Sequence, residues 1–179
     1  MCLVVGKAYG VPTVALRFFN VYGPGQSLGN PYTGVAAIFS ARLLAGAPPL
    51  VFEDGTQSRD FIHVQDIARA CYLILESRDV AGVALNVGTG RPTTIADVAE
   101  VLQRTLGGPP AQVLGSYRAG DIRHCYADIS AIRRTLGWEP MFSFEQGMDD
   151  LARWVRTQSG DARGQEQAYS ELRTHGLVR

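Results

Sequence analysis

The sequence predicts an α/β protein built on a parallel sheet, and two observations support this. The run 13–19, TVALRFF, is apolar on both faces and rich in β-branched and aromatic residues, as in a strand that helices cover on both sides. Segments with helical apolar spacing then follow, with short strand-like runs between them. A length of 179 residues with 46% hydrophobic residues suits one domain or one and a half.

Charge and cysteine content argue against several classes of protein. The formal net charge is +0, so the chain offers no basic surface for nucleic acid and no polybasic patch for a membrane. The three cysteines, Cys2, Cys71 and Cys125, are widely spaced, which disfavours a disulfide framework or a zinc site. The apolar start 1–5 is short and lacks a positively charged n-region, so no signal peptide or membrane span is expected. A reducing, cytoplasmic location fits these features.

Strands and helices are expected to follow one another along the chain. A first helix ends near Ala8 and is closed by Gly10, and a helix at 34–45 stops at Gly46. The other expected elements are strands at 50–52, 61–63 and 83–87, and helices at 65–77, 95–106, 129–136 and from 144 onward. Polar residues mark several helix starts: Thr94 with Asp97, Asp128, and Ser143 with Gln146.

The helix at 65–77 is amphipathic, and its start carries a histidine. Its apolar residues predict a face that packs inward, formed by Ile67, Ala70, Cys71, Ile74 and Leu75. His63 stands at the step from strand to helix, with no recognisable nucleophile or paired carboxylate beside it. A structural hydrogen bond is therefore expected of His63 in preference to catalysis.

Arg59 is the first candidate binding residue. It lies between the Asp54-Gly55 turn and the strand at 61–63, where rigid neighbours on both sides can aim a guanidinium at a planar anion such as a phosphate. The alternative is that Arg59 and Asp60 are an ordinary solvated start of a strand.

Asn20 is the second candidate. It leaves the carboxyl end of the strand at 13–19, the edge at which open α/β sheets bind ligands. The alternative for Asn20 is an Asx turn that ends the strand.

The turn Gly88-Thr89-Gly90 follows a strand and precedes a helix, as a dinucleotide-binding turn does. The third glycine of that motif is missing, because Thr93 stands in its place. No acidic residue ends a strand about twenty residues later to hold a ribose. The spacing therefore argues against a dinucleotide site at this turn.

Five stretches of the chain resemble one family. They are RFFNVYGPGQ (17–26), EDGTQSRDFIHVQDIA (53–68), NVGTGRPTTIADVAEVL (86–102), SYRAGDIR (116–123) and ADISAIRRTLGWEPMFSFEQGMDDLARWV (127–155). Together they resemble the later part of the NAD-dependent epimerase/dehydratase family, the extended short-chain dehydrogenase/reductases that act on nucleotide sugars. Ala119 departs from the family's pattern, which has proline there.

The resemblance implies a role for each candidate site residue. Arg59 and Arg118 would contact the nucleotide diphosphate, each guanidinium pairing with two oxygens, and Asp121 would contact the phosphates or ribose. Arg123 contacts nucleotide in some branches of the family. The remaining implied contacts are Asn20 with the sugar nucleotide, the strand at Val51 with the base, and Phe18 and Phe19 with the nicotinamide of NAD. Taken singly, each arginine could equally be a surface cation.

The resemblance also implies two lobes. Residues 1–23 and 60–90 would belong to a Rossmann-like parallel sheet, and residues 24–59 and 91–158 to a small α/β substrate lobe. A polar tail would occupy residues 159–179.

Two motifs of complete family members are not in this sequence. One is the glycine motif G-x-x-G-x-x-G that holds the NAD pyrophosphate; the other is the catalytic Tyr-x-x-x-Lys. Lys7 is the only lysine, and the residue four before it is Leu3. No catalytic residue is therefore assigned, NAD is implied as cofactor only for an intact member, and the chain alone is expected to be inactive.

The resemblance narrows the expected activity to that of a 4-epimerase. The stretch Pro31-Tyr32-Thr33-Gly34 resembles members that act on UDP-glucose or dTDP-rhamnose, so the partner would be a UDP- or dTDP-linked sugar and an intact member would be a homodimer. Two alternatives stay open. The chain could be a non-catalytic module that binds sugar nucleotides or pairs with a separate Rossmann chain, or an inactive remnant with an open apolar strand edge.

Overall fold

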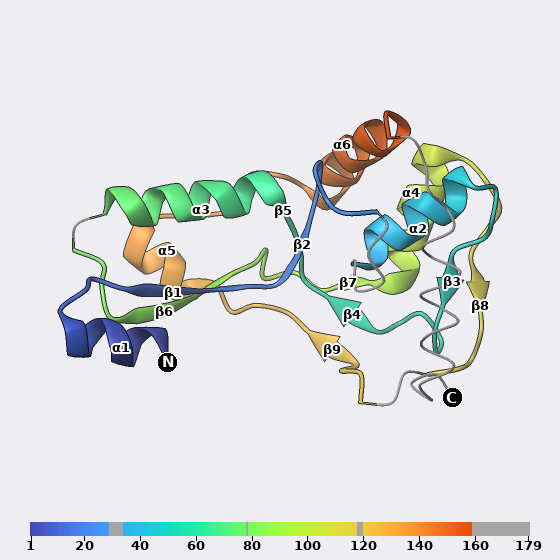
Figure 1. Cartoon of the computed structure of the whole chain (residues 1–179). Coiled ribbons are helices and arrows are strands. Elements are labelled where there is room, and N and C mark those ends of the chain that lie inside the picture. The colour runs from blue at the N-terminus through green and yellow to red at the C-terminus, as the bar shows by residue number, and fades with distance from the viewer. Residues whose placement is uncertain (29–33, 78, 118–119, 159–179) are drawn as a thin grey trace.

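The protein has an α/β fold (Figure 1). The structure is a computed structural model, and it describes residues 1–28, 34–77, 79–117 and 120–158. Its helices are α1 (Cys2–Tyr9), α2 (Val35–Leu44), α3 (Val64–Glu76), α4 (Ile95–Leu106), α5 (Ser130–Leu136) and α6 (Phe144–Arg156). Its strands are β1 (Val14–Phe18), β2 (Asn20–Tyr22), β3 (Leu50–Val51), β4 (Ser58–Arg59), β5 (Phe61–His63), β6 (Val83–Val87), β7 (Thr93–Thr94), β8 (Gln112–Val113) and β9 (His124–Cys125). All six expected helices are present.

The chain passes from β1 into β2 and changes its strand partner on the way. β1 pairs in parallel with β6, and β2 pairs in parallel with β5. Between them, the Phe19 N–H donates to the Val87 carbonyl at 3.2 Å and the Asn20 N–H donates to the Asp60 carbonyl at 2.9 Å. In Figure 1, α1 lies on one side of the β1–β6 pair, and α3 and α5 lie on the other. Asn20 therefore lies where two parallel strand pairs meet.

Short strands form the part of the molecule that contains Arg59. β3 pairs in parallel with β8, while β4 pairs antiparallel to β7 and parallel to β9. The strands of these two sheets have two residues each, too few to show a period of two in the sequence. For this reason β4, β7, β8 and β9 were not expected from the sequence.

Two apolar cores hold the elements together. The first lies among α2, α4 and α6, and its fully buried members include Val98, Leu102, Met148, Leu151 and Val155. The second lies between the β1–β6 pair and the helices α3 and α5, and includes Ile62, Ala70, Val87, Ile132 and Trp138. The expected boundaries of the two lobes stay a prediction.

The helix starts agree with the sequence at two positions and differ at a third. Capping boxes form between Thr94 and Asp97 and between Ser143 and Gln146. Asp128 was expected to be the N-cap of α5, but α5 begins at Ser130. The Asp128 carboxylate still accepts the Ser130 N–H at 2.9 Å, and its pKa is lowered chiefly by its hydrogen bonds from Ser130. It therefore stabilises the helix start from one residue further away.

One residue of α3 that the sequence predicts to be buried is exposed. Ile67 and Ala70 are buried and Cys71 packs partly buried against the second core, but Leu75 is 84% exposed. Leu75 is about 80° of helical rotation away from Ile67, so it lies at the margin of the buried stripe. The prediction that Leu75 packs inward was wrong.

Candidate functional site

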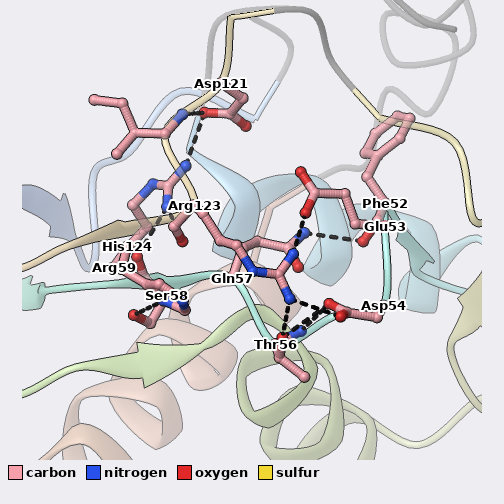
Figure 2. Close-up of polar contacts among 11 residues, drawn as sticks. Phe52, Glu53, Asp54, Thr56, Gln57, Ser58, Arg59, Asp121, Arg123 and His124 are labelled. Atoms are coloured by element: carbon pink, nitrogen blue, oxygen red, sulfur yellow. Dashed lines mark hydrogen bonds and ion pairs between the residues drawn. The ribbon is translucent and has the colours of Figure 1, made fainter.

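Arg59 extends from β4 and is held at three points (Figure 2). Its Nη1 donates to the carbonyl oxygens of Ser58 at 2.8 Å and Arg123 at 3.1 Å, and its Nη2 donates to Asp121 Oδ1 at 2.7 Å. The side chain is only 15% exposed. A guanidinium has five N–H donors, so within the described residues two remain for an external anion.

Asp121 is the anion that faces Arg59. Its Oδ1 accepts from Arg59 and also from the Ile122 N–H at 2.9 Å, and its side chain is 42% exposed. The structure thus brings together Arg59 and Asp121, two residues expected to contact the same nucleotide. The guanidinium already forms the kind of charge-assisted hydrogen bond that a phosphate oxygen would accept.

Arg123 lies next to this pair but points to a different group. Its Nη1 donates to Glu53 Oε2 at 2.6 Å, and its Nη2 donates to Asp54 Oδ2 at 2.7 Å and Thr56 Oγ1 at 2.8 Å. The hydrogen bond from Arg123 is the main reason why the pKa of Asp54 lies well below its usual value. In this structure the Arg123 guanidinium binds protein carboxylates, and its contact with nucleotide stays a prediction.

Val51 offers no side-chain surface to a base. Its side chain is 1% exposed and packs in the first core, and its carbonyl accepts the Leu114 N–H at 2.9 Å. A base that rested on β3 would have to contact the backbone or a neighbouring side chain. The sequence showed the strand but not which way Val51 faces.

Asn20 lies one strand away from the Arg59 segment. Its backbone N–H bonds Asp60, the residue after Arg59, and in the β2–β5 register Asn20 pairs with Phe61. Its side-chain amide makes no hydrogen bond within the described residues, so the Asx turn considered from the sequence is not formed there. The Asn20 amide is available to a ligand.

Phe18 and Phe19 have different surroundings. Phe18 ends β1 and is 48% exposed, whereas Phe19 packs partly buried against the second core. Of the two, Phe18 is the more exposed. Their expected contact with nicotinamide stays a prediction.

Asp60 is completely buried and binds the Gly88-Thr89-Gly90 turn. Its carboxylate accepts the backbone N–H of Thr89 at 2.7 Å, Gly90 at 2.9 Å and Ala127 at 3.1 Å, together with the Thr89 hydroxyl at 2.7 Å. A Cβ at Gly88 would lie 2.6 Å from Asp60 Oδ2, so the close approach needs glycine there. The idea that Asp60 is part of a solvated strand start was wrong.

The hydrogen bonds of Asp60 also determine whether the Gly88-Thr89-Gly90 turn could bind a dinucleotide. The N–H groups that could cradle a pyrophosphate already bind Asp60, a fixed internal carboxylate. The turn is structural, in agreement with the missing third glycine, which argued against a dinucleotide site. Within the described residues, the turn therefore does not fit the NAD pyrophosphate.

Asp66 is a second buried carboxylate with a structural role that the sequence did not reveal. It accepts the backbone N–H of Met141 at 2.9 Å and Phe142 at 3.1 Å, while its carbonyl accepts Trp138 Nε1 at 3.3 Å. These bonds tie the start of α3 to the connection between α5 and α6. The Asp residues of the stretch 59–66 thus hold the scaffold, and Arg59 faces the site.

His63 has the structural role expected from the sequence. Its Nδ1 accepts the Gln65 N–H at 3.4 Å as the N-cap of α3, and its ring stacks on Phe142 at a centroid distance of 4.1 Å. The ring is buried, and Nε2 lies 3.3 Å from Asp150 Oδ2 without the alignment of a hydrogen bond. Burial lowers the pKa of His63, and the nearby Asp150 and Asp66 oppose this only in part.

The lowered pKa of His63 predicts a pH dependence of stability. As the pH falls below about 6.5, the unfolded chain binds a proton at this histidine before the folded chain does. The contribution of neutral His63 is therefore complete above pH 6.5 and is lost as the pH falls from there. We expect urea unfolding to show a smaller free energy of unfolding at pH 5.5 than at pH 7.5. His63→Gln should remove much of this difference, and an unchanged pH dependence in this variant would contradict the assignment.

The described part of the chain sets some further bounds. None of its helices has the length and apolar character to cross a membrane, and no group of three or more His, Cys, Asp or Glu side chains there could hold a metal ion. Cys2, Cys71 and Cys125 are free thiols. Arg118 and the segment 31–33, which the sequence also singled out, lie outside the described residues.

Fold and site together define an α/β protein that holds an arginine against a carboxylate beside a parallel strand junction. The chain belongs to the NAD dependent epimerase/dehydratase family, whose model matches residues 1–88. It is 40% identical over 144 residues to the dTDP-L-rhamnose 4-epimerase of Burkholderia thailandensis, an alignment that covers 80% of this chain and 40% of that protein.

Solved structures of 4-epimerases also match this chain. The UDP-glucose 4-epimerase of Thermotoga maritima, solved with UDP-glucose, matches with a TM-score of 0.76 and 35% identity, over 86% of this chain and 48% of that one. The UDP-glucuronic acid 4-epimerase of Bacillus cereus, solved with UDP-glucuronic acid and NAD, matches with a TM-score of 0.77 and 29% identity, over 87% and 48%. The chain thus spans about half the length of the relatives it matches.

Proposed function

We propose that this chain forms the nucleotide-sugar-binding part of a 4-epimerase that acts on a UDP- or dTDP-linked sugar. The names of its relatives support this, since they include a dTDP-L-rhamnose 4-epimerase and a UDP-glucose 4-epimerase. The proposal concerns binding, because Tyr-x-x-x-Lys and G-x-x-G-x-x-G do not occur in the 179 residues. We assign no catalytic residue to this chain and no step to NAD.

The pair of Arg59 and Asp121 is the observation that carries the proposal. A guanidinium that is 15% exposed, fixed by two backbone carbonyls and, among the described residues, left with two N–H donors is suited to bind a diphosphate. Asp121 is the more exposed partner and would turn to the ribose hydroxyls as the phosphate takes its place. Asn20, whose side-chain amide makes no hydrogen bond within residues 1–28, 34–77, 79–117 and 120–158, would contact the sugar side of the ligand.

Ligand-induced thermal stabilisation tests this proposal. A ligand that binds only the folded chain raises its stability by about 2.7 kcal/mol when present at a hundred times its dissociation constant. We expect UDP, dTDP, UDP-glucose and dTDP-L-rhamnose, or one nucleotide series among them, to raise the melting temperature, whereas uridine without phosphates has a much smaller effect. Equal shifts with uridine and UDP would contradict a diphosphate site.

An exposed apolar surface favours a second proposal, that this part works joined to a nucleotide-binding half. On α1, Val4 is 72% exposed and Tyr9 80% exposed, and beside them lies a largely apolar hollow of about 530 Å³ lined by α1, residues 10–13 and Gly82. Within the described residues β1 is paired on one edge only, with β6. The relatives are about twice as long as this chain. A segment that carries G-x-x-G-x-x-G would cover the hollow and extend the sheet from β1.

Charged substitutions on α1 test this surface. Val4→Lys combined with Tyr9→Lys places two cations on it, and we expect weaker self-association of the chain, because exposed apolar patches drive association. Light scattering after size-exclusion chromatography over a range of concentrations measures the effect. Leu75→Lys, on the exposed side of α3, is the matched control and should behave as the unmodified chain. Equal effects of the α1 and α3 variants would show that α1 is not a special surface.

A further inference from the structure

The turn between β3 and β4 is held in an unusual conformation. Glu53 has a φ of 53°, in the left-handed region that favours glycine. Its backbone N–H donates to the Ser116 carbonyl at 2.7 Å, and the Asp54 carboxylate accepts the Thr56 N–H at 3.0 Å. A non-glycine residue persists in this region only when its surroundings fix it. The turn therefore needs contacts that hold it in place.

Arg123 supplies these contacts from a distant part of the chain. It lies just before β9, and its guanidinium bridges the carboxylates of Glu53 and Asp54 and the hydroxyl of Thr56 (Figure 2). One cation thus binds three side chains of a four-residue segment. Each carboxylate has a charge-assisted hydrogen bond from Arg123, although Glu53, Asp54 and Arg123 together keep one net negative charge.

The backbone of Arg123 acts at the same time on the phosphate-binding candidate. Its carbonyl accepts the Ser58 N–H at 2.9 Å and Arg59 Nη1 at 3.1 Å. The side chain fixes the turn that follows β3, while the carbonyl fixes the guanidinium that faces Asp121. A single residue therefore connects the expected base-binding strand with the expected phosphate-binding arginine.

We infer that Arg123 is a positioning residue that holds the turn 53–56 in register with Arg59 and does not itself contact the nucleotide. This inference rests on the proposed nucleotide site, and it replaces the direct nucleotide contact that the family resemblance implied for Arg123. The positioning role concerns the base side of the ligand, since the carbonyl that holds Arg59 does not depend on the side chain. Removing the side chain should affect nucleotides more than inorganic diphosphate.

A positioning role and a direct contact of Arg123 predict opposite changes in nucleotide affinity when its carboxylate partners are removed. If Arg123 positions the turn, then Glu53→Gln with Asp54→Asn breaks the same unit and weakens UDP or dTDP binding, as Arg123→Ala does, by about tenfold. The triple variant should be no weaker than Arg123→Ala, because all three side chains act together. If Arg123 binds the ligand, removing its two carboxylate partners would free it and tighten binding.

The experiment is a calorimetric titration of the full chain and these variants with UDP, dTDP and inorganic diphosphate. We expect Arg123→Ala to weaken binding of the nucleotide and leave the inorganic diphosphate affinity within about twofold, whereas Arg59→Ala weakens both. Tighter nucleotide binding by the Glu53→Gln, Asp54→Asn variant, or equal losses for diphosphate and nucleotide in Arg123→Ala, would overturn the inference. Arg104→Ala, an exposed arginine of α4, is the matched control.

Amide hydrogen exchange of the free chain separates this inference from the proposed function. Arg123→Ala should speed exchange of the Glu53 and Thr56 amides by about tenfold or more, because the Glu53, Asp54 and Thr56 side chains that Arg123 binds are no longer held in place. Unchanged exchange would overturn the positioning role even if nucleotide binds. Failure of the unmodified chain to bind UDP, dTDP or diphosphate would contradict the nucleotide site and with it the link to Arg59, while the exchange result still decides whether Arg123 holds the turn.

Discussion

Replacing Asp60 with alanine is expected to lower the free energy of unfolding by about 4 kcal/mol, the largest loss predicted for a single polar side chain of this protein. The carboxylate is completely buried and accepts three backbone N–H groups and one hydroxyl. Each buried donor left without an acceptor costs about 1–3 kcal/mol. The donors come from the turn after β6 and from Ala127, so the loss would loosen two connections at once.

Asparagine at the same position separates shape from charge. Asp60→Asn keeps the size of the side chain but places an NH₂ group opposite backbone N–H donors, so we expect a loss of about 2–3 kcal/mol. Urea unfolding measures both variants. Asp149→Asn, an exposed carboxylate with one hydrogen bond to Thr105, is the control and should change stability by about 0.5 kcal/mol or less. If Asp60→Asn behaves like this control, the buried carboxylate is not the centre of the scaffold.

Arg59→Ala is expected to weaken nucleotide binding about a hundredfold, the largest effect on binding predicted here. Two charge-assisted hydrogen bonds to a diphosphate, at about 1.5 kcal/mol each, give a loss of this size. Arg59→Lys keeps the charge but loses the flat guanidinium, so an intermediate loss of about tenfold is expected. Loss of the ion pair with Asp121 should by itself change the stability of both variants little, because the Asp121 side chain is 42% exposed.

Asp121 and the ligand compete for the Arg59 guanidinium, and this competition gives a second test of the Arg59 site. The Asp121 carboxylate already neutralises Arg59 at 2.7 Å, so an incoming phosphate replaces one anion with another. Asp121→Asn removes the competing charge. It should tighten binding of inorganic diphosphate, which has no ribose. The affinity for a nucleotide should rise less or fall, because the proposed contact between Asp121 and the ribose is also lost. An identical effect on both ligands would show that Asp121 does not contact the ribose.

Much of the secondary structure followed from local patterns. The capping box of α4 was visible because Thr94 and Asp97 are three residues apart, and the start of α6 was visible for the same reason with Ser143 and Gln146. The parallel pairing of the strand at 13–19 followed from its two apolar faces. Such features depend on neighbours in the sequence, so a single sequence shows them.

The buried carboxylates could not be identified in this way. Asp60 binds N–H groups that are 29 and 67 residues further along the chain, at Thr89 and Ala127, and nothing beside it in the sequence shows that water is excluded. Asp66 binds residues 75 and 76 positions away. A charged residue next to a strand is more often solvated, so the local interpretation of Asp60 favoured the wrong environment.

The candidate site was predictable in part. Arg59 was singled out from its place between a turn and a strand together with the family resemblance, and the structure puts Asp121, expected from the resemblance, against it. The Arg123 side chain could not be placed, because its partners depend on the left-handed backbone of Glu53. The burial of Val51 likewise depends on how β3 packs against helices that come earlier and later in the chain.

A calorimetric titration of the chain with UDP and dTDP, alongside Arg59→Ala and the control Arg104→Ala, tests the proposed nucleotide site directly. We expect saturable binding of one or both nucleotides, a loss of about a hundredfold in Arg59→Ala, and an unchanged affinity in Arg104→Ala. Binding that is equally strong in Arg59→Ala, or no binding of either nucleotide by the unmodified chain, would contradict the claim that Arg59 forms the centre of a nucleotide-sugar site.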